Sequence, residues 1–339
     1  MTNRDRVIAA LEFRQTDKLP YNVDMTKPMY EKMFADPDGR AFLPKINNHI
    51  SSISLRRPYE EIPGKPGFFK DEFGVVWNRS IDKDVGVVEN KLIPNPDSLK
   101  DFTFPVLDEK HLRGECERLA ARANGNFTVA SLGYSLFERA WSLCSMEDML
   151  CYMVSDPEFV HELLNKLVAF DMRKVDIFLE YNIDCILFGD DWGQQKGLIM
   201  GPLHWREYIL PCLKELYGKA RDAGRWVAQH SCGDLREILG DVIGAGLNMY
   251  QTFQPEIYGL AEYKPKLDKK LAIWGGISTQ ADLPFKTPAQ IAEITRETIN
   301  IMWKNGGYLA APTHAVPWDV PVANIIAMVE AFENAQRFQ

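Results

Sequence analysis

A regular alternation of strand-like and helix-like segments, which runs from residue 126 onward, is the feature that most limits the possible folds of this chain. The strand-like runs are short and apolar: 127–132, 183–188, 226–230, 247–252, 271–274 and 308–311. The segments between them have helical character: 137–154, 157–179, 203–223, 234–244, 258–266 and 288–304. Strands that alternate with helices favour a parallel sheet. Together with a strand at 19–24, they supply seven of the eight strands of a (β/α)8 TIM barrel, which is an α/β fold.

The alternation alone fits either a closed barrel or an open doubly wound sheet. No Gly-x-Gly-x-x-Gly follows the first strand, which disfavours the dinucleotide-binding version of the open sheet. Residues 1–125 carry the first strand and an extension: a helix at 4–14, a mixed and partly helical stretch at 28–65, a hairpin within 70–93 and a charged helix at 107–123. The hairpin has β-prone runs at 73–79 and 85–88 around a polar turn at 82–84. We therefore predict a single domain over 1–339, with the regular repeats in 126–339.

Charge and composition exclude several classes of partner. The chain has 39 Lys and Arg against 47 Asp and Glu, which gives a net charge of −8. This balance argues against a nucleic-acid or anionic-membrane surface as the main partner. No run approaches the roughly 20 apolar residues of a membrane span. The six cysteines lack the spacing of a disulfide scaffold and no signal peptide is recognised, so we expect a cytoplasmic protein.

His230 and Cys232 form the most informative local motif. They stand two residues apart at the end of the strand at 226–230, and strand side chains repeat every second residue, so both point to one side. An imidazole and a thiolate on one face make half of a zinc site. The alternative is a buried histidine bonded to the backbone beside an inert core cysteine. His314 follows the last predicted strand and supplies a third ligand if the barrel closes, leaving a fourth position open as catalytic zinc requires.

Two carboxylates, Asp190 and Asp191, follow the strand at 183–188 and are the predicted catalytic residues. One of them can act as a fourth metal ligand, as a residue that orients the ligands, or as a substrate-binding group. The alternative is that one caps the next helix.

Other polar and aromatic side chains gather at the predicted carboxyl ends of the strands, where TIM barrels place their chemistry. The predicted substrate-binding residues are Asp24, Met25, Tyr134, Trp192, Phe253 and Trp274. The aromatic members can line an aromatic substrate pocket, or they can be ordinary core or rim residues. His49, His111, His161 and His204 lie in helical or loop contexts and are interpreted as structural or solvent-exposed.

Several motifs resemble the uroporphyrinogen decarboxylase superfamily, and within it the corrinoid-dependent methyltransferases. The similar segments extend over nearly the whole chain: 4–11, 17–20, 71–77, 189–193, 230–234 and 311–317. The resemblance implies a TIM barrel with an N-terminal helical and hairpin extension.

The chain departs from the superfamily pattern at two places. The decarboxylases carry an Arg-Gln-Ala-Gly-Arg type motif after the first strand, where residues 21–27 here read Tyr-Asn-Val-Asp-Met-Thr-Lys. A substrate with many carboxylates needs cationic clamps, so this difference argues against porphyrinogen decarboxylation. The zinc methyltransferases use a His-x-Cys pair, which His230 and Cys232 match, plus a cysteine near the last strand, where this chain has His314. Exchanging a thiolate for an imidazole makes the bound zinc more cationic and suits it to polarise an oxygen leaving group.

The resemblance therefore implies a methyltransferase that takes methyl from a methoxylated substrate, with a phenyl methyl ether as the leading donor. Zinc would polarise the ether oxygen, and cobalt(I) of a corrinoid would accept the methyl group. The chain has no Asp-x-His-x-x-Gly motif for binding cobalamin, so the resemblance implies a separate corrinoid protein as partner. Three alternatives stay open: a decarboxylase of a small or tetrapyrrole acid, methyl transfer from the corrinoid to a thiol, and a binding barrel without turnover. The decarboxylase would need an arginine near the mouth of the barrel to clamp its substrate, and Arg139 is the candidate. The sequence also leaves open whether the chain forms a homodimer.

Overall fold

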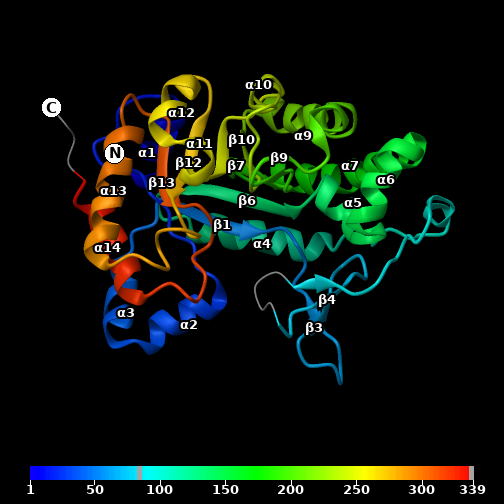
Figure 1. The fold of residues 1–339 in the computed structure, drawn as a ribbon, viewed down its shortest axis with the longest axis horizontal. Helices are drawn as coiled ribbons and strands as arrows, with labels where there is room; N and C mark the ends of the chain where they lie inside the picture. The colour runs from blue at the N-terminus through cyan, green and yellow to red at the C-terminus, as the bar shows by residue number, and fades with distance from the viewer. Residues whose placement is uncertain (82–85, 336–339) are drawn as a thin grey trace.

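The centre of the protein is a curled sheet of parallel strands (Figure 1). The computed structural model describes residues 1–81 and 86–335. Seven strands pair in the order β1-β6-β7-β10-β11-β12-β13, each parallel to its neighbours. Their bounds are Ile50–Ser54 (β1), Phe127–Tyr134 (β6), Cys185–Gly189 (β7), Trp226–His230 (β10), Met249–Phe253 (β11), Ala272–Ile277 (β12) and Tyr308–Pro312 (β13).

The segment around residues 20–25 occupies the eighth position of the barrel. Tyr21 makes a parallel bridge to Ala310 of β13, and Met25 makes one to Val316 beyond it. On the other side, the Tyr21 carbonyl accepts a 3.0 Å hydrogen bond from the backbone of His49, just before β1. The segment thus lies between the two outer strands of the sheet. The predicted TIM-barrel fold is confirmed, although the predicted strand at 19–24 forms isolated bridges instead of a regular strand.

Strand β1 is the one that the sequence pattern missed. The stretch 28–65 was expected to be mixed and partly helical, and it contains α2 (Lys27–Ala35), α3 (Pro37–Phe42) and the 3-10 turn Leu43–Lys45 before β1. The strand itself reads Ile-Ser-Ser-Ile-Ser, and only Ile50 is fully buried. So polar a strand lacks a clear apolar signal, and its pairing with β6 identifies it.

Helices surround the sheet (Figure 1). Those between or after barrel strands include α4 (Glu109–Arg122), α5 (Leu136–Cys144), α6 (Met146–Ser155), α7 (Pro157–Leu179), α8 (Gly201–His204), α9 (Leu210–Asp222), α10 (Leu239–Gly244), α11 (Pro255–Tyr258), α12 (Leu260–Leu267), α13 (Pro288–Met302) and α14 (Val322–Glu333). A π-helical turn at Trp205–Ile209 joins α8 to α9, and the short strands β8 (Gly193–Gln194) and β9 (Gly197–Leu198) form a hairpin after β7.

Two of the predicted helices differ from those observed. The helix expected at 137–154 is broken at Ser145, which has a positive φ of 86° and whose hydroxyl caps α6 by accepting from the backbone of Asp148. The first half of the helix expected at 234–244 is instead a series of turns, and α10 begins at Leu239. The helix predicted at 157–179 has the bounds of α7.

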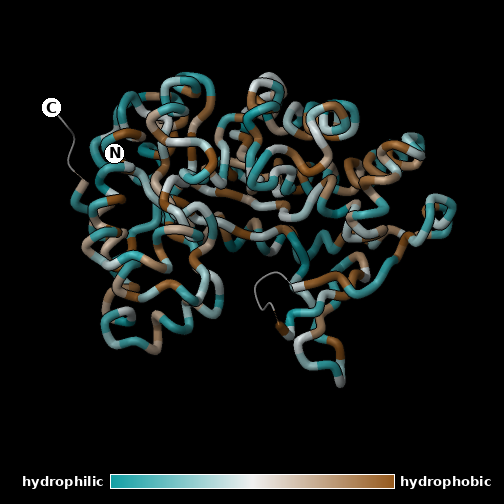
Figure 2. The backbone as a smooth tube through the Cα atoms, in the orientation of Figure 1, coloured by the Kyte–Doolittle hydropathy of each residue, from teal (hydrophilic) through white to brown (hydrophobic). Residues whose placement is uncertain are grey.

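The hydrophobic core has two parts, and the central strands carry much of its hydrophobic sequence (Figure 2). The larger part packs the sheet against the surrounding helices. The smaller part includes strand residues such as Phe127, Met249 and Leu309, and α1 (Asn3–Leu11) adds Val7 and Leu11 to it. Because α1 contacts β1, β6 and β13, this helix packs beneath strands from both edges of the sheet.

A small antiparallel sheet forms the extension after β1. It contains β2 (Glu60–Glu61), β3 (Phe68–Lys70), β4 (Val76–Asn78) and β5 (Val87–Val88), in that order, and the 3-10 turn Pro96–Lys100 follows. The predicted hairpin is present, because β4 pairs antiparallel with β5. Its predicted polar turn at 82–84 lies outside the described residues.

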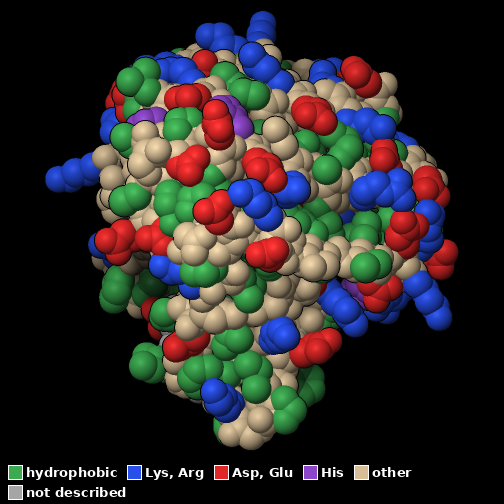
Figure 3. Space-filling view, turned by 90° about the vertical axis from the view of Figure 1, so that its right-hand side faces the viewer, with side chains coloured by type: hydrophobic (Ala, Val, Ile, Leu, Met, Phe, Trp, Pro, Cys, Tyr) green, Lys and Arg blue, Asp and Glu red, His purple; other side chains and the backbone are tan. Residues whose placement is uncertain are grey.

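Acidic and basic side chains are mixed over the face drawn in Figure 3. None of the helices in the described part of the chain is long and apolar enough to cross a membrane.

Candidate metal centre

His230 and Cys232 lie together at the carboxyl end of β10. His230 is the last residue of the strand, and Cys232 follows two positions later in the loop. The Sγ atom of Cys232 is 3.9 Å from Nε2 of His230. Both side chains are partly buried. The alternation of side chains along a strand therefore continues into the loop and places both groups on one side.

His314 reaches the same place from the loop after β13. Its ring lies 5.4 Å from the ring of His230, between centroids, at an interplanar angle of 76°. The ligand atoms of His230, Cys232 and His314 all lie within 4.8 Å of one another. Two strands separate β10 from β13 in the sheet, so the curl of the barrel is what brings these side chains together.

The donor set and its spacing fit a zinc ion. Tetrahedral zinc, with bonds of about 2.0–2.3 Å, holds its ligand atoms roughly 3.5 Å apart, close to the distance between Sγ and Nε2. The Nδ1 atom of His230 is 2.7 Å from Oε1 of Gln251, an acceptor that favours the proton on Nδ1 and leaves the Nε2 lone pair for a metal. Three protein ligands leave one position open for a substrate.

Asp191 connects the loop after β7 to this centre. Its Oδ1 accepts a 2.7 Å hydrogen bond from the backbone N–H of Cys232 and lies 3.8 Å from Nε2 of His230. Burial and the charge of Asp191 raise the pKa of the Cys232 thiol. A bound cation opposes this effect, because metal binding displaces the thiol proton. Asp191 is therefore placed to orient the loop that carries Cys232.

Asp190 faces a different set of groups. Its carboxylate is buried and accepts hydrogen bonds from the backbone N–H groups of Phe137 and Glu138, at 3.0 and 2.7 Å, and from the Trp192 indole. It thereby caps α5, whose own N-cap residue makes no side-chain hydrogen bond. Burial raises the pKa of Asp190 to about 7 despite these hydrogen bonds. The contacts give Asp190 a structural role, and its catalytic role stays a prediction.

Glu138 is a carboxylic acid near the centre that sequence reasoning missed. It lies in the first turn of α5 and is buried, and burial together with the charges of Asp191 and Asp190 raises its pKa well above the usual range. An acidic residue in the first turn of a helix is ordinary, so the sequence offered no signal for it.

Three of the predicted substrate-binding residues are accessible or half-buried at the carboxyl end of the barrel. Asp24 is solvent-exposed, yet the protein around it raises the pKa of its carboxyl group by desolvation. Met25 is half-buried and pairs with Val316, two residues beyond His314. Tyr134 ends β6 and stacks on Trp77 of the extension, with ring centroids 5.5 Å apart.

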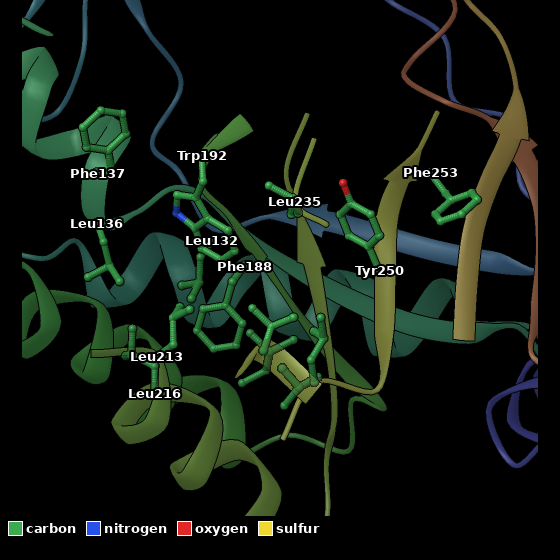
Figure 4. Packing of buried hydrophobic residues seen from close by; sticks show 14 of the residues in the cluster. Leu132, Leu136, Phe137, Phe188, Trp192, Leu213, Leu216, Leu235, Tyr250 and Phe253 are labelled. Carbon is green, nitrogen blue, oxygen red and sulfur yellow. The ribbon is translucent and has the colours of Figure 1, made fainter. Parts of the chain in front are cut away.

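The other three, Trp192, Phe253 and Trp274, are core residues. Their exposures are 0%, 0% and 2%. Figure 4 shows Trp192 beside Leu132 and Phe253 at the end of β11, while Trp274 belongs to the smaller core cluster. Their predicted substrate contacts stay untested, and their burial does not favour that role.

Arg139, the arginine that sequence inspection offers as a substrate clamp for a decarboxylase, is held inside the protein. Its Nη1 atom lies 2.6 Å from the Asp71 carboxylate, and both side chains are almost completely buried. This guanidinium stacks on the ring of Phe73, 4.3 Å from its centroid. Arg139 thus joins α5 to the extension, and its charge is neutralised there.

Residues 79–335 match the family model described as uroporphyrinogen decarboxylase (URO-D), and the chain belongs to that family. A methyltransferase from Methanosarcina mazei is similar in structure, with a TM-score of 0.71 and 16% sequence identity over 98% of both chains. At this identity, the likeness supports the fold alone.

Two sugar epimerases give weaker structural matches. A D-psicose 3-epimerase matches at a TM-score of 0.38 and 14% identity, over 70% of this chain and 84% of its own. An L-ribulose 3-epimerase matches at 0.40 and 12% identity, over 92% and 88%. These scores are too low to carry an argument. No curated protein matches the chain.

Proposed function

We propose that this protein is a methyltransferase that takes a methyl group from a methoxylated substrate and passes it to cobalt(I) of a corrinoid carried by a separate protein. The observation that carries the proposal is the convergence of His230, Cys232 and His314 at the carboxyl end of a URO-D family barrel. Active sites of TIM barrels lie at that end of the strands.

In this proposal the three side chains hold a zinc ion. When bound, it supplies Lewis acidity that weakens the bond between an ether oxygen and its methyl carbon. Gln251 fixes the ring of His230 through Nδ1, and Asp191 holds the backbone of Cys232. These contacts preorganise the ligands from outside the site.

The choice of an oxygen ether over a thiol rests on His314. A set of one thiolate and two imidazoles leaves a bound zinc more cationic than a set with two thiolates, and a more cationic metal is the stronger Lewis acid. The aromatic nature of the donor is proposed because the half-buried ring of Tyr134 lies at this end of the barrel. Cobalamin is assigned to a partner because the chain lacks the motif that binds it.

Metal content and methyl transfer test the proposal together. We expect the purified protein to hold about one zinc per chain, and Cys232→Ala and His314→Ala to lose it. With reduced corrinoid protein and methoxylated aromatic compounds, the wild type should form methylcobalamin and both variants should not. Cys151→Ala, which removes an exposed cysteine far along the chain from these loops, serves as the matched control and should keep both properties.

Other outcomes would assign a different function. Wild type without bound metal, or His314→Ala with most of its activity, would contradict the proposal. Release of carbon dioxide from an added acid without corrinoid would identify a decarboxylase. Methyl transfer from methylcobalamin to a thiol, with no reaction of ethers, would reverse the assigned direction.

A further inference from the structure

Arg56 presents a positive charge at the same end of the barrel as the metal centre. It follows β1 by two residues, and the intervening Leu55 extends the pairing with β6 through a 2.7 Å hydrogen bond to the Ser131 carbonyl. Arg56 is half-buried, and its guanidinium lies over the ring of Tyr134, 4.7 Å from the ring centroid. Stacking on an aromatic face holds a guanidinium while leaving its N–H groups available in its plane.

The position of Arg56 depends on a glycine in the next strand. A Cβ atom at Gly133 would lie 2.3 Å from Nε of Arg56, so the arginine side chain passes directly over the backbone of β6. The positive φ of Gly133, 71°, also disfavours any other residue. The sequence therefore leaves space for this side chain to cross from β1 to Tyr134.

No carboxylate of residues 1–81 and 86–335 forms an ion pair with Arg56, although its charge acts on the buried Glu138 and partly opposes the rise in the pKa of that carboxyl group. To the described residues its guanidinium makes one hydrogen bond, from Nη1 to the Tyr59 hydroxyl at 3.4 Å, out of five N–H groups that can donate. The adjacent Arg57 pairs with Glu60, and Arg139 pairs with Asp71. Arg56 is thus an arginine in a defined position, and most of its donors make no hydrogen bond within the described part of the chain.

The strand register relates Arg56 to the metal centre through a row of paired residues across β6, β7 and β10. Tyr134, beneath Arg56, is paired with Gly189, and Gly189 is paired with His230. Two strand spacings separate Tyr134 from His230, which is about 10 Å. Gly189 lies between them, and the backbone of β6 approaches it so closely that a Cβ atom there would lie 2.8 Å from the Gly133 carbonyl oxygen. This span is comparable to a benzene ring with substituents at opposite ends, hydrogen-bonded at one end and held near a metal at the other.

We propose that Arg56 anchors a carboxylate of the substrate, so that the substrate class is methoxylated aromatic acids and not neutral methoxy compounds. The inference rests on the proposed function for the position of the methoxy group, but not for the anion site itself. A guanidinium binds a carboxylate through two parallel N–H···O bonds, a geometry that a neutral amide cannot match.

Binding measured without corrinoid tests the anchor. The probes are 4-methoxybenzoate and its neutral isostere 4-methoxybenzamide, titrated calorimetrically into wild type, Arg56→Gln and the control Arg57→Gln. We expect wild type and Arg57→Gln to prefer the benzoate by about 10- to 100-fold, as for the loss of a charged hydrogen bond. Arg56→Gln should lose the preference while keeping its affinity for the benzamide.

The opposite results would overturn the anchor. These are no preference in the wild type, a retained preference in Arg56→Gln, or an equal loss in Arg57→Gln. If circular dichroism shows that Arg56→Gln does not fold, Arg56→Lys tests the anchor instead. Lysine keeps the positive charge but lacks the paired N–H donors of a guanidinium, so we expect a smaller preference for the benzoate than in the wild type. An unchanged preference in Arg56→Lys would contradict paired recognition by the guanidinium.

The anchor and the proposed reaction can fail separately. Arg56-dependent binding without methyl transfer to cobalt(I) would refute the reaction and leave the anion site in place. Equal methyl transfer from benzoate and benzamide would refute the anchor and leave the reaction.

Discussion

The close approach of the loops after β7 and β10 requires glycine at one position in each loop. Gly233 has a positive φ of 84°, and a Cβ atom there would lie 2.2 Å from the carbonyl carbon of Gly193. The same contact leaves no room for a side chain at Gly193. The glycine beside Cys232 is therefore required by the packing of one loop on another, whatever metal the cysteine holds.

His49 is a buried histidine whose charge should govern stability at acid pH. It lies between the first segment of the barrel and β1, where Nδ1 is 3.4 Å from the backbone nitrogen of Tyr21 and Nε2 has no hydrogen-bond partner. Burial, assisted by the charge of Arg6, lowers the pKa of His49 to about 4. Folding therefore favours the neutral ring, and the stability it contributes is fully present above the unfolded pKa of about 6.5 and is lost as the pH falls through about 4.

We predict that this histidine costs the wild type about 3 kcal/mol of unfolding free energy between pH 7 and pH 4. His49→Gln should lack this part of the pH dependence, since glutamine does not titrate. Urea unfolding of both proteins across that range measures the difference. Parallel pH profiles would show that His49 is protonated in the folded protein as easily as in the unfolded one.

Among the elements, the antiparallel extension is joined to the barrel by a buried charge network. The Asp71 carboxylate accepts hydrogen bonds from the backbone of Phe73 and Val75, from the Trp77 indole and from Arg139, at 2.9, 3.0, 3.2 and 2.6 Å. The extension and α5 are thus linked through one side chain. Removing one partner of a buried ion pair leaves the other charged and unsolvated.

We predict that Asp71→Ala destabilises the protein by about 3–5 kcal/mol, because Arg139 is left without its partner. Asp97→Ala is the matched control, since Asp97 pairs with Lys100 at 2.7 Å on an exposed turn, where ion pairs contribute at most about 1 kcal/mol. Denaturant unfolding of the two variants compares them. A similar small loss for both would mean that the extension is held mainly by its apolar contacts.

At the scale of the whole molecule, the candidate centre joins β10 to the loop after β13 across the curl of the sheet. A ligand that binds the folded protein alone raises its stability by mass action. A metal held here would therefore resist opening of the barrel.

We predict that zinc at about 100 times its dissociation constant adds about 2.7 kcal/mol to the stability of the metal-depleted wild type. Thermal unfolding with and without zinc measures this as an increase in Tm. Cys232→Ser should lose the increase, and Cys151→Ser should keep it. An increase of the same size in all three proteins would place the zinc elsewhere on the molecule.

The sequence by itself determined most of the elements, because the signals for them are short-range. Helix α7 has the predicted bounds, since Asp156 caps it and Pro157 starts it. Strand β10 also has the predicted bounds, and its first three residues are apolar. Strand periodicity also placed His230 and Cys232 on one side. It failed for β1, whose serine-rich sequence carries no such pattern.

The tertiary structure alone decided which side chains meet. Closure of the sheet brings His314, in the loop after β13, to His230 of β10, three strand positions away. Pairing of β1 with β6 places Arg56 over Tyr134. Packing of α5 on the barrel and on the extension also buries Asp190 as a helix cap and Arg139 as a structural ion pair, although the sequence marks both as functional candidates. Periodicity fixes the direction of a side chain relative to its own element, whereas the partner of that side chain depends on strand order, register and curl, which are set by contacts between residues far apart in the chain.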